Sequence, residues 1–384
     1  MSGVPERAEV VIVGGGVMGA SIAFHLAEAG VEDVLLLERG ELAGGSTSRA
    51  AGGVRAQFSD PLNVRLGQRS LEAFADFGRR PGWEIDLRRV GYLFLLTREE
   101  DVQAFTASVE LQNELGVPSR MISPQEAREL SPLIEIDDVI AAAWSPEDGH
   151  ATPEAVVQGY ASGARRLGAT ILTGTEVTAI DREGDSIVAV RCGDAAVRTG
   201  AVVCAAGAWS AAVGEMAGVP LPVEPLRRQV LYTEPMEGLP EHVPMTIDFS
   251  TGFYFHREGQ GLLMGMGDPA ETPGYKLSAT DDWIPALMEV AARRAPVITD
   301  AGIAGGWAGL YEVSPDHNAI VGEASAPGRF LYATGFSGHG FLQGPAVGEI
   351  VRDLYLGEQP FVDVTPLSVE RFAGSAVRPE RNVV

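Results

Sequence analysis

The chain has 384 residues, about two and a half times a typical domain of roughly 150, so we expect two domains and exclude a disordered segment or a small disulfide scaffold. The 29 basic and 52 acidic residues give a formal net charge of −23, which would repel phosphate backbones and anionic lipid headgroups, so we expect neither nucleic acid nor membrane partners. The longest apolar runs are too short to span a bilayer, and the N-terminal one lacks a signal-peptide cleavage pattern.

The first 38 residues predict a βαβ unit. A continuous, β-branched apolar run over 9–13 is typical of a parallel strand that is buried on both faces. Small and apolar residues recur at helical spacing over 17–29, Gly30 follows as a C-terminal cap would, and 34–37 predicts a second strand.

A glycine motif lies at the turn between the first strand and the helix. Gly14, Gly16 and Gly19 allow, in that order, a tight turn, the approach of a pyrophosphate to the backbone, and close helix–strand packing. The helix N-terminus would hold the diphosphate. Glu38 ends the second strand, where a carboxylate binds ribose hydroxyls and disfavours NADP, so FAD and NAD remain as alternatives.

The rest of the chain alternates between two kinds of pattern. Helices are expected over 63–78, 99–115, 153–167, 281–294 and about 345–356. The stretch 83–97 alternates like antiparallel strands around a turn at 89–91, and the Pro/Gly/acid-rich break at 145–153 predicts a crossing between domains. Strands are expected at 169–172, 176–181, 187–191, 202–205 and 330–333, with extended, aromatic-dotted stretches between 227 and 311.

The loop after Glu38, ERGELAGGSTSRAAGGVRAQFS, replaces a third Rossmann strand with glycines, serines and arginines. Together with VVCAAGAWS (202–210), GGWAGLYEVSPDHNAIVGE (305–323) and YATGFSGHGFLQGPAVGE (332–349), the chain resembles the D-amino acid oxidase family of flavoproteins over nearly its whole length. The resemblance is closest to the sarcosine oxidase beta subunits and glycine oxidase-like amine oxidoreductases.

This resemblance implies a mixed α/β fold of the glutathione-reductase-like type with two interleaved domains. A Rossmann-type FAD-binding domain would comprise residues 1–82, 150–225 and 328–384. A substrate-binding domain on a mixed or antiparallel sheet would comprise 83–149 and 226–327.

The resemblance also implies a set of residues that bind FAD. They are Gly14, Gly16, Val17, Met18, Gly19, Glu38, Arg39, Ser46, Thr47, Ser48, Gly52, Gly53, Val177, Ala206, Gly207, Trp209, Gly335, Ser337, Gly338, His339, Gly340, Phe341 and Leu342. In 335–341, successive backbone N–H groups before a helix can stabilise negative charge on a reduced flavin ring. In monomeric sarcosine oxidase a cysteine just before the residue matching Tyr311 carries the flavin, whereas Leu310 precedes it here, so we expect non-covalent FAD.

For the substrate, the resemblance points to an amine nitrogen beside a carboxylate. Arg55 matches the arginine that holds the carboxylate, which a guanidinium can do bidentately. Tyr254, Tyr311 and His339 are the other candidate catalytic residues, Tyr311 standing where glycine oxidase has its carboxylate-binding arginine. We expect oxidation of a secondary amino acid amine, such as sarcosine or proline, by hydride transfer from Cα to flavin N5, giving an imine that hydrolyses.

Several alternatives stay open. The chain could be a D-amino acid or glycine oxidase, an FAD-bearing non-catalytic subunit or assembly factor within a hetero-oligomer of oxidase subunits, or an NAD dehydrogenase. The electron acceptor is molecular oxygen or another compound; the only lysine, Lys276, lies in a polar stretch, which favours a dehydrogenase. Cys192 and Cys204 are too few for a disulfide framework and lack metal-ligand spacing, so we expect a cytoplasmic protein without a metal site.

Overall fold

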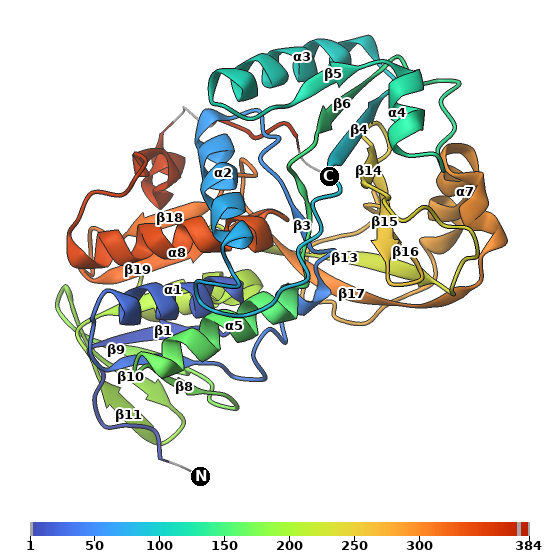
Figure 1. The fold of residues 1–384 in the computed structure, drawn as a ribbon. Helices are drawn as coiled ribbons and strands as arrows, with labels where there is room; N and C mark the ends of the chain where they lie inside the picture. The colour runs from blue at the N-terminus through green and yellow to red at the C-terminus, as the bar shows by residue number, and fades with distance from the viewer. Residues whose placement is uncertain (1–2, 375–377, 383–384) are drawn as a thin grey trace.

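The computed structural model describes residues 3–374 and 378–382, and Figure 1 shows two sheets in separate lobes. The first sheet has the strand order β18-β19-β12-β1-β2-β8. These strands are β18 (Ile320–Glu323), β19 (Phe330–Thr334), β12 (Val202–Cys204), β1 (Val10–Val13), β2 (Val34–Leu37) and β8 (Thr170–Leu172). All neighbours run parallel except β18 and β19. This is an open, Rossmann-type sheet with one antiparallel edge strand.

Each central strand of this sheet contributes side chains to two cores. Val10 and Ile12 belong to the core with α1 (Val17–Glu28), α2 (Pro61–Ala75), α5 (Pro153–Arg166) and α8 (Gly340–Leu356). Val11 and Val13 belong to the core on the other face, with α6 (Ser210–Ala217) and a three-stranded sheet of β9 (Ala179–Glu183), β10 (Ser186–Cys192) and β11 (Ala195–Arg198). Because β1 is buried on both faces, it is apolar at every position.

The second sheet has the strand order β17-β13-β16-β15-β14-β4-β6-β5 and is antiparallel except for the pair β14 and β4. Its strands are β4 (Tyr92–Leu96), β5 (Arg120–Ile122), β6 (Ala141–Ser145), β13 (Glu224–Thr233), β14 (Met245–Asp248), β15 (Phe253–Glu258), β16 (Gly261–Gly265) and β17 (Ile303–Val313). The helices α3 (Glu99–Glu114), α4 (Pro124–Leu130) and α7 (Ile284–Arg294) surround it in Figure 1. A two-stranded ladder of β3 (Gly53–Val54) and β7 (Gly149–His150) lies between the lobes.

Two local expectations were wrong. The stretch 83–97 forms no hairpin: only Tyr92–Leu96 is a strand, and it pairs with β6 and β14, which local alternation could not reveal. The last long helix begins at Gly340 and not near Pro345. A proline inside a helix removes one backbone hydrogen bond, and here the burial of nearly the whole helix outweighs that loss.

The two sheets draw on the interleaved segments with small differences in boundary. The residues 1–82, 150–225 and 328–384 supply every strand of the first sheet except β18, which comes from the segment 226–327. Strand β13 of the second sheet already begins at Glu224. Both strands differ from the expected segment boundaries because strand pairing decides to which sheet a strand belongs, and a single sequence does not display that pairing.

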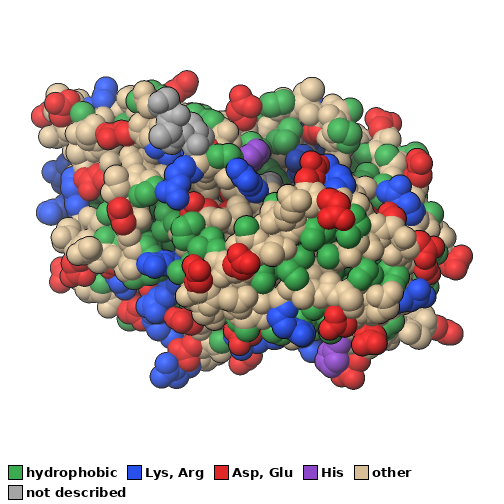
Figure 2. Space-filling view, turned by 90° about the horizontal axis from the view of Figure 1, so that it is seen from above, with side chains coloured by type: hydrophobic (Ala, Val, Ile, Leu, Met, Phe, Trp, Pro, Cys, Tyr) green, Lys and Arg blue, Asp and Glu red, His purple; other side chains and the backbone are tan. Residues whose placement is uncertain are grey.

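The surface agrees with the composition. In Figure 2 acidic side chains are spread over the whole visible face and are mixed with arginines. Within residues 3–374 and 378–382, no helix combines the length and the apolar character needed to cross a bilayer.

Candidate active site

A cavity of about 450 Å³ opens where β1, β2 and β12 end. Because these strands are parallel, their carboxyl ends meet at one edge of the sheet, which is where ligands bind in open α/β folds. Glu38 and Ala206 follow two of these strands and line the cavity. The site therefore lies where the sequence placed the dinucleotide.

The glycine turn shapes the floor of this cavity. Gly14 has φ of +114°, and a Cβ there would lie 2.3 Å from the carbonyl oxygen of Ala205. A Cβ at Gly19 would lie 1.9 Å from the carbonyl oxygen of Gly14, so glycine at position 19 lets α1 approach the turn, and glycine at position 14 lets the turn approach the end of β12. The first turn of α1 carries no acidic residue, which leaves its positive dipole end free for a diphosphate.

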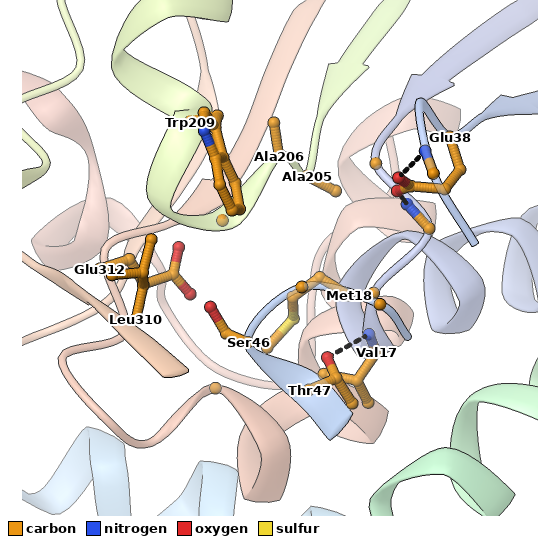
Figure 3. Close-up of a pocket in the computed structure, with 18 of the residues that line it drawn as sticks. Val17, Met18, Glu38, Ser46, Thr47, Ala205, Ala206, Trp209, Leu310 and Glu312 are labelled. Carbon is orange, nitrogen blue, oxygen red and sulfur yellow. Dashed lines mark hydrogen bonds between the residues drawn. The ribbon is translucent and has the colours of Figure 1, made fainter. Parts of the chain in front are cut away.

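The backbone fixes the carboxylate of Glu38. It accepts hydrogen bonds of 2.7 Å from the N–H groups of Gly15 and Gly40, one on each oxygen, as the dashed lines in Figure 3 show. Carboxylate oxygens have further lone pairs, so both can still accept bonds from ribose hydroxyls.

The cavity wall beside the glycine turn contains a serine hydroxyl without a partner among the described residues. The Oγ atom of Ser46 is buried and makes no hydrogen bond among the described residues. In Figure 3 Ser46 points into the cavity from one side, while Trp209 and Glu312 border it from the other. Thr47 differs from Ser46, because its Oγ1 accepts a bond of 3.1 Å from the N–H of Val17. An orphaned hydroxyl beside a glycine turn and a ribose-binding acid fits the diphosphate and ribose of FAD.

Glu312 is a buried carboxyl group in the cavity wall. It accepts hydrogen bonds from Thr334 Oγ1 at 2.9 Å and from the N–H of Gly335 at 3.2 Å. Burial nevertheless raises the pKa of Glu312 to about 7, because desolvation disfavours the carboxylate more than these bonds favour it. This residue was not predicted, although it lies within the third motif.

Most of the predicted cofactor residues line this cavity. They are Gly14, Gly16, Val17, Met18, Glu38, Arg39, Ser46, Thr47, Val177, Ala206, Gly207, Trp209, Gly338, Gly340 and Phe341. Ser48 instead lines a neighbouring cavity of about 860 Å³, and a smaller cavity contains Gly52, Gly53, His339 and Leu342.

The remaining predicted residues, Gly19, Gly335 and Ser337, line none of these three cavities. Ser337 Oγ accepts a bond of 3.1 Å from the N–H of Ser314, which points to a structural role in the loop before α8.

The smaller cavity, of about 110 Å³, adjoins the larger one. Both are lined by Arg228, Tyr311 and Gly338, and a Cβ at Gly338 would lie 2.5 Å from the Tyr311 ring. Three arginines, Arg49, Arg55 and Arg228, line the smaller cavity, and among the described residues no aspartate or glutamate does. In a chain with an excess of acidic residues, this is a site for an anion.

Arg55, predicted to hold the substrate carboxylate, is buried in this wall and is already partly engaged. Its Nη1 donates to the carbonyl oxygen of Gln57, and its Nη2 donates to that of Asn382 at 2.6 Å. The Nε2 atom of His339 lies 3.1 Å from Nη2. Since arginine can only donate, His339 must accept through Nε2 and carry its proton on Nδ1. Desolvation lowers the pKa of His339 to about 3, so the ring is neutral.

Arg228 is a site residue that the sequence reasoning missed. The Nε atom of Arg228 is buried and makes no hydrogen bond among the described residues. None of the ion pairs between described residues includes Arg228. Its neighbour Arg227 instead donates to Glu271 at 2.5 Å. Alternation along β13 places adjacent side chains on opposite faces, but only the tertiary structure shows that the face of Arg228 borders the cavity.

Three tyrosines complete the smaller cavity. Tyr254 and Tyr311 were predicted, whereas Tyr92 was not. Burial raises the pKa of each phenol above its usual value, so all three are neutral and can donate a hydrogen bond. Met245, Ile247 and Met266 provide apolar surface between them.

The helix α8 begins between the two cavities. Phe341, in its first turn, lines both of them, and that turn carries no acidic residue. The positive end of its dipole therefore faces the region where an anionic ligand or a reduced flavin ring would lie.

Comparison with known proteins agrees with this geometry. Residues 9–354 match the family described as DAO, FAD dependent oxidoreductase. The chain is 30% identical to the mitochondrial dimethylglycine dehydrogenase of Rattus norvegicus over 96% of its own length but only 45% of that protein, so it spans less than half of this relative.

Two solved structures share the whole fold. The L-proline dehydrogenase from P. horikoshii has a TM-score of 0.91 at 36% identity, covering 96% of this chain and 99% of that one. The glycine oxidase from Geobacillus kaustophilus has a TM-score of 0.85 at 27% identity, with the same coverage of 96% and 99%. With the glycine turn, the ribose-binding acid and the family match in agreement, the chain belongs to the DAO family of FAD-dependent oxidoreductases.

Proposed function

We propose that this oxidoreductase acts on a small amino acid with a secondary amine, such as N-methylglycine or proline. The observation that carries the proposal is the smaller cavity, which adjoins the larger one and is lined by three arginines and, within the described part of the chain, by no acidic residue. Similarity to a protein named L-proline dehydrogenase supports a secondary amine, and similarity to one named dimethylglycine dehydrogenase supports an N-substituted amino acid more generally.

The chain's own residues would bind and orient this substrate. Arg228, with its unpartnered Nε, and Arg55, which keeps two N–H groups free for a ligand, would together hold the carboxylate. The phenols of Tyr92, Tyr254 and Tyr311 would orient the polar end of the substrate. FAD bound in the larger cavity supplies a two-electron acceptor for the C–H bond beside the nitrogen.

The apolar part of the wall favours a secondary amine. Met245, Ile247 and Met266 offer surface for an N-methyl group or for ring methylenes. Burial also favours the neutral amine over the ammonium ion, and oxidation requires the neutral form. The imine product would then hydrolyse in water. Glycine oxidase or D-amino acid oxidase activity is the second candidate, which the structural similarity to a glycine oxidase supports.

The acceptor and cellular setting are part of this proposal. The Nζ atom of Lys276 donates to Glu271 at 2.6 Å, and Lys276 lines none of the three cavities, so no lysine borders the flavin site to promote reaction with oxygen. We propose an acceptor other than oxygen and a cytoplasmic location, which the free thiols of Cys192 and Cys204 support. Assembly with other oxidase subunits is also part of the proposal, and the resemblance to sarcosine oxidase beta subunits supports it.

Anaerobic mixing of the purified flavoprotein with sarcosine, dimethylglycine, L-proline, glycine and D-alanine tests the function. We expect sarcosine or proline to bleach the visible flavin absorption, and glycine and D-alanine to leave it unchanged. Bleaching by glycine or D-alanine would support the second candidate, and no bleaching by any of them would favour an assembly role. Repeating the assay in air and with an artificial acceptor tests the use of oxygen.

A further inference from the structure

The last described residues contact Arg55, which lines the smaller cavity, called the substrate cavity from here on. The segment 378–382, which we call the C-terminal strap, lies against the start of α2. Glu380 and Asn382 are only 3% and 2% exposed. Such burial of a carboxylate requires compensation by hydrogen bonds.

Six hydrogen bonds compensate the burial of the Glu380 carboxylate, and the carboxylate accepts every one of them. Its Oε1 accepts from the N–H and Oγ of Ser59, at 3.0 and 2.6 Å, and from the N–H groups of Arg381 and Asn382, at 3.1 and 2.9 Å. Its Oε2 accepts from Asn63 Nδ2 at 2.8 Å and from the N–H of Asp60 at 3.3 Å. Six donors around one carboxylate make Glu380 the anchor of the strap.

The anchor fixes the strap with respect to Arg55. Two residues after Glu380, the carbonyl oxygen of Asn382 accepts from Arg55 Nη2 at 2.6 Å. Together with Gln57 and His339, this contact holds the plane of the guanidinium and leaves two of its five N–H groups for a ligand. No ion pair among the described residues involves Arg55, and the Glu380 carboxylate favours its charged form against the cost of burial.

We propose that Glu380 and Asn382 are positioning residues, which hold the Arg55 guanidinium in the wall of the substrate cavity so that it can bind the carboxylate of an amino acid. This inference rests on the proposed function. It assigns the C-terminal strap to the substrate site, although the strap lies more than 300 residues from Arg55 in the sequence.

The first variant is Glu380→Gln. All six contacts to Glu380 are donors, so an amide would turn its own N–H₂ group against at least one of them. The strap would then loosen, and Arg55 would lose a fixed contact. The matched control is Arg381→Gln, because that side chain is exposed, lies in the same strap and makes no hydrogen bond among the described residues.

Binding of a carboxylate that cannot be oxidised, pyrrole-2-carboxylate, is followed by the change in the flavin spectrum of each holoenzyme. We expect Glu380→Gln to raise the dissociation constant and the KM of the amine substrate about tenfold or more, to change kcat less than about threefold, and to retain its FAD. Arg381→Gln should stay within about twofold of the wild type. A merely structural role would lower the thermal midpoint without this split between KM and kcat.

Ser59→Ala keeps the test decisive if Glu380→Gln does not fold, because it removes only one of the six donors. It should raise KM several-fold in the same direction. Equal carboxylate binding by the wild type, Glu380→Gln and Ser59→Ala would overturn the role of the strap and leave the proposed function standing. A wild-type holoenzyme that binds no carboxylate and is reduced by no amine would overturn both.

Discussion

Replacing Arg228 by methionine tests whether this arginine binds the carboxylate of the substrate. The change removes the charge and all five donors but keeps a long, flexible side chain. Arg228 makes one hydrogen bond, a contact of 3.4 Å to the carbonyl oxygen of Arg227, and its Nε has no partner, so folding should suffer little. The guanidinium lies 5.1 Å from the centre of the Tyr311 ring, and such a cation–π contact contributes about 0.5–1 kcal/mol at exposed sites and about 2 kcal/mol when desolvated.

The expected loss lies in binding. A hydrogen bond to a charged group contributes roughly 1.5–3 kcal/mol. At 1.4 kcal/mol for each factor of ten, Arg228→Met should raise the KM of the amine and the dissociation constant of a carboxylate ligand roughly 10- to 150-fold. The assay is steady-state kinetics with an artificial acceptor, together with carboxylate titration of the flavin spectrum.

Arg227→Met is the matched control. It removes the same charge from the adjacent residue, whose side chain pairs with Glu271 and does not line the substrate cavity. We expect a loss of stability from Arg227→Met with little change in KM. If Arg228→Met kept its KM within about twofold of the wild type, or if both variants raised it equally, the assignment of Arg228 to the carboxylate would be refuted.

Three further predictions concern the cofactor and the pH dependence of stability. Glu38→Gln should raise the FAD dissociation constant at least about tenfold in fluorescence titrations of the apoprotein. Both carboxylate oxygens of Glu38 accept from backbone N–H groups, whereas an amide can accept through only one of its two atoms. An unchanged affinity would contradict the role of Glu38. Acid precipitation should leave the flavin in the supernatant, since no cysteine or histidine of residues 3–374 and 378–382 lines the larger cavity. Flavin in the pellet would show a covalent bond. Burial and the neighbouring Arg80 lower the pKa of His25 from 6.5 to about 4. Between these two pH values the unfolded chain binds a proton that the folded chain does not, so the free energy of unfolding falls as the pH drops through this window. Relative to His25→Gln, the wild type should lose about 2 kcal/mol between neutral pH and about pH 5 in urea unfolding, and parallel pH profiles of the two proteins would refute it.

The cofactor half of the site followed from local sequence. The glycine turn, the first helix and Glu38 lie within 38 residues, and each depends on steric and hydrogen-bonding rules that act over a few residues. The apolar run of β1 predicted a strand buried on both faces, and the structure confirms it. The resemblance then extended this prediction to Ala206, Trp209 and Gly338, which line the same cavity.

The substrate half depended on pairing between distant segments. The sequence predicted extended chain around Tyr92, but only its parallel pairing with β14 brings Tyr92 beside Tyr254 and Arg55. Likewise, nothing local distinguishes Arg228 from Arg227, because both lie in one strand and only the packing of β13 decides which one meets an acidic partner.

By itself, the sequence determined the class of fold, the dinucleotide turn and the acidic residue for the ribose, because these are encoded by neighbouring residues. The tertiary structure alone decided that Arg228 has no acidic partner among the described residues, that His339 is a neutral acceptor for Arg55, and that Glu380 ties the C-terminal strap to the start of α2. These features arise where long-range contacts remove side chains from water, and the free energy of each charge depends on the partners that it meets there.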